Sequence, residues 1–174
     1  MKRSFRRIIT TSREKDTPTS CIFALQQIER TTMSKLEEFK KKKAAQQRAA
    51  NEKFLRDNTL KQGVVALGEG LAYEVLEEGH GKVHPSVQDW VTIHYEGQLI
   101  NGKIFDSSLG KNKPPTFKLN NLIEAWQRVV PLMVVGDKWR LVVPPTMGYG
   151  ERPNGNIPGN SILIFELELL SIGR

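Results

Sequence analysis

The spacing of apolar residues along the chain changes near Gly63. Before this point, residues 35–61 contain neither Gly nor Pro and are rich in Ala, Lys, Gln and Glu, which favours an α-helix. After it, short runs alternate between apolar and polar residues, as in half-buried β-strands. The pattern therefore predicts a long N-terminal helix followed by a sheet-forming domain.

Both ends of the predicted helix carry boundary signals. Ser34 and Glu37 have the spacing of a capping box, in which the Ser hydroxyl accepts an early helical N–H and the Glu reaches back. Gly63 suits the left-handed conformation that ends many helices. A helix of about seven turns is expected over residues 35–61. Its apolar stripe is thin, so three alternatives stay open: it packs on the following domain, it forms a homodimer through the 35–61 helix, or it leaves the helix in solvent.

Alternation is clearest in residues 90–99 and 162–169. Asn101-Gly102 fits a type I′ hairpin turn, because both residues tolerate positive φ. Shorter strands are expected at 71–76, 103–106, 116–119 and 138–143, and one short helix at 121–130. These elements predict the α+β class, with a curled antiparallel β-sheet, a half-barrel, wrapped around one short α-helix and preceded by the long N-terminal helix.

The charge divides the chain in the same way. Residues 1–62 hold 16 Lys and Arg against 7 Asp and Glu, a net charge of +9, whereas the rest holds 10 against 12, a net of −2. A nucleic-acid or acidic-membrane partner is one interpretation of the basic third. A solvated basic helix is favoured over specific nucleic-acid binding, because no aromatic residues are interleaved for base stacking. The predicted division is a disordered or non-native extension over 1–33, a basic helix over 34–62 and a folded domain over 63–174.

The first residues allow two interpretations. Residues 1–13 carry five basic residues and no acid, which fits an organelle transit peptide, but their apolar stretch is too short for a secretory signal. In the other interpretation translation begins at Met33, just before the predicted helix. Cys21 is the only cysteine and cannot form an intrachain disulfide, and no apolar run is long enough to span a bilayer. A cytoplasmic location is therefore expected.

Aromatic residues at the ends of the predicted strands and turns are the candidates for chemistry. The set has one carboxylate and contains no obvious nucleophile, no metal ligands and no phosphate loop, which describes an apolar pocket for a small ring. His80 and His84 are four residues apart, but Gly81 and Pro85 oppose the helix that would bring them to one face, so no metal site and no cofactor are expected. The set consists of Tyr95, Phe105, Asp106, Trp126, Tyr149, Ile157 and Phe165.

Six segments can be read together: IHYEGQL (93–99), NGKIFDSS (101–108), NKPPTFKL (112–119), LIEAW (122–126), VGDKWRLVVPPTMGYG (135–150) and IPGNSILIFELELLSI (157–172). In this order and spacing they resemble the FKBP-type peptidyl-prolyl cis-trans isomerases, the tacrolimus-binding immunophilins. The preceding helix and residues 54–81 are similar to the bacterial branch related to macrophage infectivity potentiators. Members of that branch carry an N-terminal helical dimerisation region.

The resemblance implies a role for each candidate residue. Trp126 would be the floor on which the substrate proline ring rests, and Asp106 would lie at the rim, bonded to Tyr95 or facing the twisting amide. Tyr149 and the backbone N–H of Ile157 would hold substrate carbonyls. The implied catalytic residues are Tyr95, Asp106, Tyr149 and Phe165, and the implied substrate-binding residues are Phe105, Leu122, Ile123, Trp126 and Ile157.

The resemblance also implies an activity: rotation about X-Pro bonds during protein folding, on unfolded or partly folded proline-containing polypeptides, with tacrolimus-like macrolides as further ligands. The alternative is a non-catalytic module that tethers partners through the pocket or the basic helix. Three departures from the family pattern affect selectivity. Lys111 replaces an Arg and should pair more loosely with Asp106. Pro115 replaces a pocket-edge aromatic, and the loop 150–159 has Pro153 and Asn154 where a hydrophobic residue or His is usual.

Overall fold

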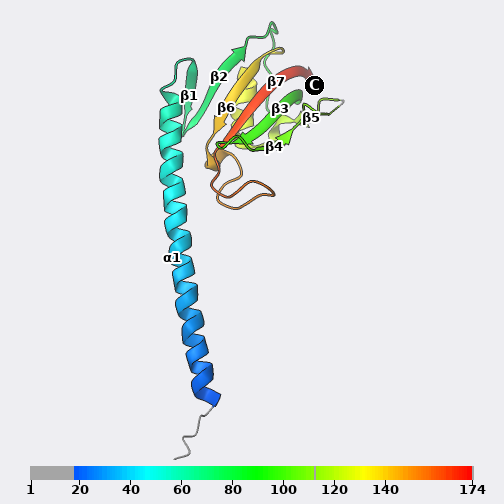
Figure 1. Ribbon diagram of the computed structural model, residues 1–174. Coiled ribbons are helices and arrows are strands. Elements are labelled where there is room, and N and C mark those ends of the chain that lie inside the picture. Colours follow the sequence, from blue (N-terminus) through cyan, green and yellow to red (C-terminus); the bar gives the residue numbers. More distant parts are fainter. Residues whose placement is uncertain (1–17, 112, 174) are drawn as a thin grey trace, which may run out of the picture. The chain divides into compact units, whose positions relative to one another are not determined.

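The computed structural model describes residues 18–111 and 113–173, with side-chain surroundings from residue 33 onward (Figure 1). The chain divides between Lys43 and Ala44 into two compact units. Helix α1 (Pro18–Thr59) begins well before the start predicted from the capping box. Pro18 is tolerated in the first turn, where its missing N–H would have no helical acceptor, and no Gly or Pro follows it before Gly63.

The capping-box residues Ser34 and Glu37 consequently lie inside α1. A cap stabilises a helix only where the preceding chain leaves helical geometry, so the motif does not start a helix here. Residues 18–33, part of the extension predicted to be disordered or non-native over 1–33, are helical, so the disordered alternative does not hold for them, while the non-native alternative stays a prediction. The transit-peptide interpretation rests on residues 1–13, which lie outside the described residues.

The second unit contains one antiparallel sheet. Its strand order is β1-β2-β6-β7-β3-β4, and β5 pairs with β3 beyond the end of β4. Figure 1 shows β7 between β6 and β3 in the middle of this sheet. The strands are β1 (Val64–Gly68), β2 (Leu71–Glu77), β3 (Trp90–Leu99), β4 (Ile104–Ser107), β5 (Thr116–Lys118), β6 (Lys138–Val143) and β7 (Leu163–Gly173).

A short helix, α2 (Glu124–Val129), packs against one face of the sheet, and three single 3₁₀ turns join the elements around it: η1 (Leu119–Asn121), η2 (Val130–Leu132) and η3 (Pro145–Met147). Ala125, Trp126 and Val129 of α2 belong to the same buried cluster as the inward residues of β3, β6 and β7. Residues along β3 and β7 alternate between buried and half-buried, because successive side chains point to opposite faces of the sheet. The predicted fold class, a curled antiparallel sheet around one short helix after a long N-terminal helix, is confirmed.

Some local predictions need correction. The sequence pattern did not reveal β1, which pairs with β2 and exposes most of its residues, so that it lacks a clear buried face. The hairpin at Asn101-Gly102 forms, but its turn is not type I′. Gly102 alone has positive φ (81°), and its N–H donates to the Leu99 carbonyl at 2.9 Å, which makes a three-residue loop ending in a left-handed glycine.

Candidate functional site

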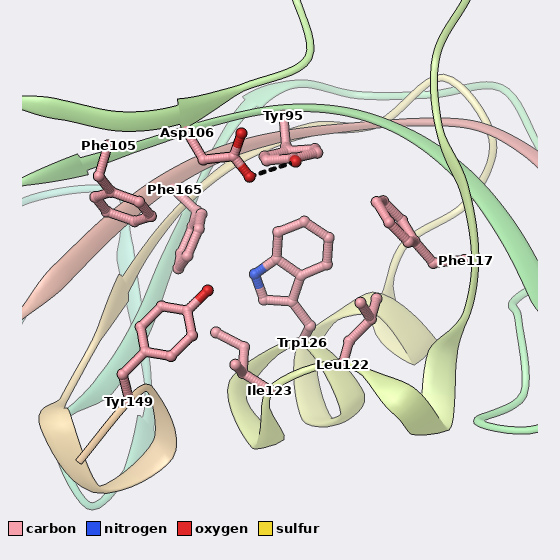
Figure 2. Close-up of a pocket in the computed structure, with 9 residues that line it drawn as sticks. All are labelled: Tyr95, Phe105, Asp106, Phe117, Leu122, Ile123, Trp126, Tyr149 and Phe165. Atoms are coloured by element: carbon pink, nitrogen blue, oxygen red, sulfur yellow. Dashed lines mark hydrogen bonds between the residues drawn. The ribbon is translucent and has the colours of Figure 1, made fainter. Parts of the chain in front are cut away.

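The nine residues drawn in Figure 2 line a pocket of about 170 Å³ between α2 and the concave side of β3, β4 and β7. This volume is smaller than the roughly 300–1,000 Å³ of sites for drug-sized ligands, so it suits one small ring. Eight of the residues expected from the sequence line it. They are Tyr95, Phe105, Asp106, Leu122, Ile123, Trp126, Tyr149 and Phe165.

The aromatic rings of the pocket form a continuous series of contacts. Trp126 is central: its ring centroid lies 5.5 Å from that of Tyr95 and 5.4 Å from that of Phe165, at interplanar angles of 74° and 87°. Phe165 then meets Phe105 at 5.7 Å and 90°, and Phe105 meets Tyr149 at 6.5 Å and 86°. Edge-to-face pairs of this kind add about 0.5–1.5 kcal/mol each beyond burial. The rings therefore fix one another's orientation before any ligand enters.

The buried indole N–H of Trp126 has no hydrogen-bond acceptor within the part of the chain that the structure describes. Figure 2 shows the indole nitrogen directed toward the side of the pocket formed by Phe165 and Tyr149. The Phe165 ring on that side is nearly perpendicular to the indole. The floor of the pocket is consequently apolar except for this indole N–H, which is a donor without a partner among the described residues.

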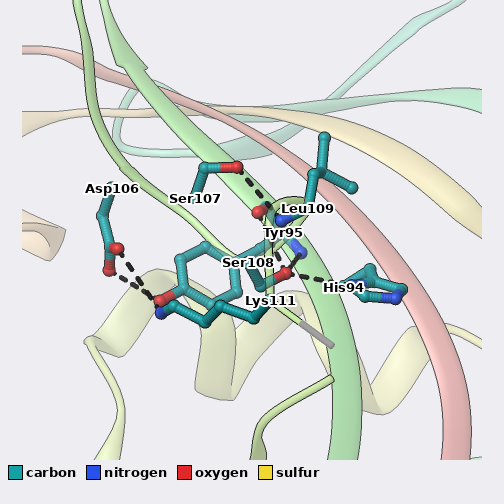
Figure 3. Close-up of polar contacts among 7 residues, drawn as sticks. All are labelled: His94, Tyr95, Asp106, Ser107, Ser108, Leu109 and Lys111. Carbon is teal, nitrogen blue, oxygen red and sulfur yellow. Dashed lines mark hydrogen bonds and ion pairs between the residues drawn. The ribbon is translucent and has the colours of Figure 1, made fainter. Parts of the chain in front are cut away.

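Polar groups lie on one rim. The Tyr95 hydroxyl donates to Asp106 Oδ2 at 2.6 Å (Figures 2 and 3). Lys111 Nζ lies 4.0 Å from Asp106 Oδ1, at the limit of a direct ion pair, and 5.9 Å from the centre of the Tyr95 ring. Both charged side chains are about half exposed, so the pair contributes little to stability. Its length agrees with the loose pairing expected of Lys at this position.

The two tyrosines of the pocket keep their protons. Burial raises the pKa of Tyr95, and the hydrogen bond to Asp106 and the negative charge of that carboxylate raise it further. Burial also raises the pKa of Tyr149, with a smaller contribution from Asp106. Both hydroxyls therefore remain neutral donors throughout the neutral and mildly alkaline range.

Ser108 holds the backbone of Tyr95 in place where β4 ends (Figure 3). Its N–H donates to the Tyr95 carbonyl at 2.8 Å, and its Oγ accepts the Tyr95 N–H at 2.8 Å. The same Oγ lies 3.1 Å from Nδ1 of His94 on the other side of the strand. Ser108 is fully buried, and its side chain replaces the carbonyl that a continuing strand would have supplied.

Ile157 does not line the pocket. Its side chain is in the core, and its N–H donates to the Asn154 carbonyl at 2.9 Å in a tight turn through Gly155. By contrast, Ile123 lines the pocket, and its N–H has no acceptor within the described residues. The structure therefore favours the Ile123 N–H, not that of Ile157, as the donor available to a ligand.

Sequence reasoning missed two residues of the site. Phe117 on β5 completes the ring series beside Tyr95, at 6.1 Å and 58°. Gly97 lies under Phe105 and Phe165: an added Cβ would be 2.6 Å from Phe105 Cζ and 2.9 Å from Phe165 Cε1. An isolated glycine inside a strand signals close approach of another group, and the glycine between Glu96 and Gln98 could have been found by that rule.

Residues 18–111 and 113–173 lack both the side-chain group of a metal site and the helix of a membrane span. This part of the chain contains no group of three or more His, Cys, Asp or Glu side chains arranged to hold a metal ion. Nor does it contain a helix that is long and apolar enough to cross a membrane. A curled sheet, a ring-sized aromatic pocket and one rim carboxylate thus define the class, an α+β domain with an aromatic pocket on one face of its sheet.

Comparison with known proteins identifies the family. The family model described as FKBP-type peptidyl-prolyl cis-trans isomerase matches residues 81–170, and the model of the domain amino terminal to it matches residues 6–75. The chain belongs to the FKBP-type peptidyl-prolyl cis-trans isomerase family. The predicted relation to macrophage infectivity potentiators is also confirmed, because a protein with that name in Trypanosoma cruzi is 38% identical over 120 residues.

Two bacterial relatives show the extent of the match. The FKBP-type 22 kDa peptidyl-prolyl cis-trans isomerase of Escherichia coli is 43% identical over 121 residues, which are 69% of this chain and 58% of that protein. The peptidyl-prolyl cis-trans isomerase Mip of Coxiella burnetii is 43% identical over 122 residues, 70% of this chain and 53% of that protein. The chain thus spans between half and three fifths of the length of these relatives. The crystal structure of FkpA from Escherichia coli superposes with a TM-score of 0.75 and 33% identity, covering 91% of this chain and 74% of that one.

The close approach at Gly97 predicts the effect of a single methyl group. In Gly97→Ala, the new Cβ would displace Phe105 and Phe165, and we expect the free energy of unfolding to fall by about 1–3 kcal/mol, as for other overpacked cores. Urea denaturation, monitored by circular dichroism, measures this free energy of unfolding. Gly110→Ala is the matched control, because nothing lies within 4 Å of its added Cβ and its φ is ordinary. An unchanged midpoint for Gly97→Ala would contradict the predicted clash.

The raised pKa of Tyr95 predicts how stability changes at alkaline pH. The hydroxyl in the unfolded chain titrates near its ordinary pKa of about 10, while the folded protein keeps its proton to higher pH. The stability that the raised pKa of Tyr95 contributes is therefore complete below about pH 9 and is lost as the pH rises above about 10. In Tyr95→Phe the free energy of unfolding should fall less steeply with pH above 10. An equally steep fall, measured by urea denaturation at a series of pH values, would show that Tyr95 is not responsible.

Proposed function

We propose that this chain is a peptidyl-prolyl cis-trans isomerase that accelerates rotation about X-Pro bonds without covalent chemistry. The observation that carries the proposal is the pocket: interlocked aromatic rings around Trp126, with a single carboxylate at the rim bonded to Tyr95. Family membership supports the same activity. The proposed catalytic residues are Tyr95, Asp106, Tyr149 and Phe165.

The energetics of the reaction suit such a pocket. Rotation about a peptide bond meets a barrier of roughly 18–20 kcal/mol, because the planar amide is stabilised by resonance. At X-Pro bonds the two isomers differ by only about 0.5–1 kcal/mol, yet they exchange over tens to hundreds of seconds. Lowering the barrier by about 4 kcal/mol gives roughly a thousandfold acceleration, which differential binding can supply.

The residues of the pocket would favour the twisted amide in two ways. Twisting removes resonance and reduces the charge on the carbonyl oxygen, so apolar surroundings formed by Trp126, Phe105 and Phe165 disfavour it less than they disfavour the planar amide. The Tyr149 hydroxyl and the Ile123 N–H would hold the flanking substrate carbonyls, so that only one side of the amide turns. The family resemblance assigned this carbonyl-holding role to the N–H of Ile157. For that N–H to bind a substrate, its hydrogen bond to the Asn154 carbonyl would have to open.

The proposed substrates are proline-containing segments of unfolded or partly folded polypeptides, and tacrolimus-like macrolides are proposed as competing ligands. The cytoplasmic location predicted from the sequence stays a prediction, and one relative, from Legionella longbeachae, bears the name Outer membrane protein MIP. N-terminal sequencing of the native protein would identify both the start site and any processing.

We also propose that α1 forms a homodimer. Met33, Leu36 and Phe39 are spaced three residues apart on this helix and are 59%, 46% and 65% exposed. A helical stripe of this kind gains stability when a second copy covers it. In the basic run that follows, Lys40 lies four residues after Leu36 and Lys43 four residues after Phe39, so lysines bound the apolar stripe on its C-terminal side.

The proposed activity predicts the effect of two substitutions. Asp106→Ala removes the rim carboxylate and Tyr149→Phe removes one hydroxyl, and each should lower kcat/KM by roughly tenfold while the circular dichroism spectrum stays unchanged. Refolding of a protein limited by proline isomerisation measures the rate. Asp89→Ala and Tyr73→Phe are matched controls, because neither residue lines the pocket. No acceleration by the wild-type chain would reject the enzyme and leave the non-catalytic binding module.

The proposed dimer predicts the mass in solution. Static light scattering should give twice the mass of one chain, and the double variant Leu36→Glu, Phe39→Glu should give the mass of a single chain, because buried carboxylates oppose association. Leu60→Glu, at an 84% exposed residue beyond the end of α1, is the control and should remain dimeric. A wild-type chain that is monomeric at high concentration would exclude the dimer.

A further inference from the structure

The last turns of α1 are packed on the sheet domain by one face of the helix. Residues 44–59 belong to the same compact unit as the sheet. Arg48, Asn51 and Leu55 follow the i, i+3, i+7 spacing of one helical face. Leu55 packs closely on Gly70, where an added Cβ would lie only 2.9 Å from Leu55 Cδ1. This part of α1 is therefore a component of the folded domain.

Asn51 is a buried polar residue of this face, with 5% of its surface exposed. Its Nδ2 donates to the Asn160 carbonyl at 2.7 Å, and its Oδ1 accepts a hydrogen bond from Gln47 at 3.1 Å. Beside it, Arg48 pairs with Glu151 at 2.5 Å. A buried amide with both ends bonded holds its partner in one position, because losing either bond leaves a polar group unsatisfied.

Both partners of the helix lie at the neck of the loop 150–160. The Asn160 N–H donates to the Gly150 carbonyl at 2.9 Å, which closes the neck, and Asn160 has a left-handed φ of 57°. The two chains touch there, since an added Cβ on Gly159 would lie 2.0 Å from the Glu151 carbonyl oxygen. Beyond the neck, residues 152–156 are exposed. The helix therefore contacts the loop at its closed base and not along its exposed part.

Tyr149 lies directly before this neck and points into the pocket (Figure 2). The adjacent Gly150 is fixed from two sides, by its N–H to the Pro145 carbonyl at 2.8 Å and by its carbonyl to Asn160. Tyr149 itself is 39% exposed and touches the other rings only through Phe105 at 6.5 Å. Its placement consequently depends on the backbone of the neck more than on packing.

We propose that Asn51 is a positioning residue of the pocket: through the Asn160 carbonyl it fixes the neck and so sets the place of Tyr149. The inference rests on the proposed function for its effect on rate. It makes the end of α1 part of the isomerase site, although no residue of α1 lines the pocket. Misplacement of a substrate-holding group by about 1 Å can reduce a rate by up to a hundredfold.

Full-length variants test the proposal. Asn51→Leu keeps the approximate size of the side chain but removes the donor, and Asn51→Asp keeps the shape but places a carboxylate against the Asn160 carbonyl. Asn58→Leu is the matched control, because Asn58 is buried to a similar degree on the same helix (7% exposed) and has no hydrogen bond to the loop. The measurements are kcat and KM on a tetrapeptide with a Leu-Pro bond, the melting temperature, and amide hydrogen exchange at Gly150 and Asn160.

Both Asn51 variants should lower kcat/KM by roughly tenfold and speed exchange at Gly150 and Asn160, whereas Asn58→Leu should lower only the melting temperature. Wild-type kcat/KM in Asn51→Leu, or an equal loss in Asn58→Leu, would overturn the proposal. If the wild-type chain does not isomerise the peptide, the proposed function fails by itself. Amide hydrogen exchange then tests whether Asn51 fixes the neck of the loop. Faster exchange at Gly150 in Asn51→Leu supports this coupling, and unchanged exchange overturns it.

Discussion

The backbone groups on the outer edge of β3 need hydrogen-bond partners along its whole length, although two different strands, β4 and β5, pair with this edge. β5 pairs with the first part of β3 and β4 with the last part, so neither covers the residues between. Ile93 donates across this gap to the Pro115 carbonyl at 3.2 Å, and Ser108 bonds the N–H and carbonyl of Tyr95. Because backbone groups buried without partners are costly, these contacts allow the chain to leave the sheet there. Tyr95, which lines the pocket, lies at this gap.

The pocket and the hydrophobic core are made of the same residues. Tyr95, Trp126 and Phe165 are buried in the main cluster and also line the pocket. Their edge-to-face packing makes the pocket rigid, while Asp106, Lys111 and Tyr149 at the rim are held by few contacts. The aromatic floor is therefore fixed by folding, and the rim is where related chains can vary without loss of the fold.

Alternating apolar residues were sufficient to predict β3, β7 and the fold class, because a one-sided sheet requires that alternation. β1 was not predicted, since it is an edge strand with little burial. The start of α1 was misplaced, since a capping box is a local signal and gives no information on whether the preceding chain is already helical. Eight of nine expected site residues meet in the pocket, and Ile157 does not, because its N–H is bonded inside its own loop. Which N–H remains free depends on turn geometry and is not encoded in residue type.

A pocket cut into the core leaves part of the core unfilled. The apolar walls around Trp126 lack packing partners on the side that faces the opening, so an occupant that fills the space also completes the packing of the domain. Any compound that enters should consequently bind the folded state alone and shift the folding equilibrium by mass action. The melting temperature of the unmodified protein can then report pocket occupancy for any candidate ligand, even one on which no reaction occurs.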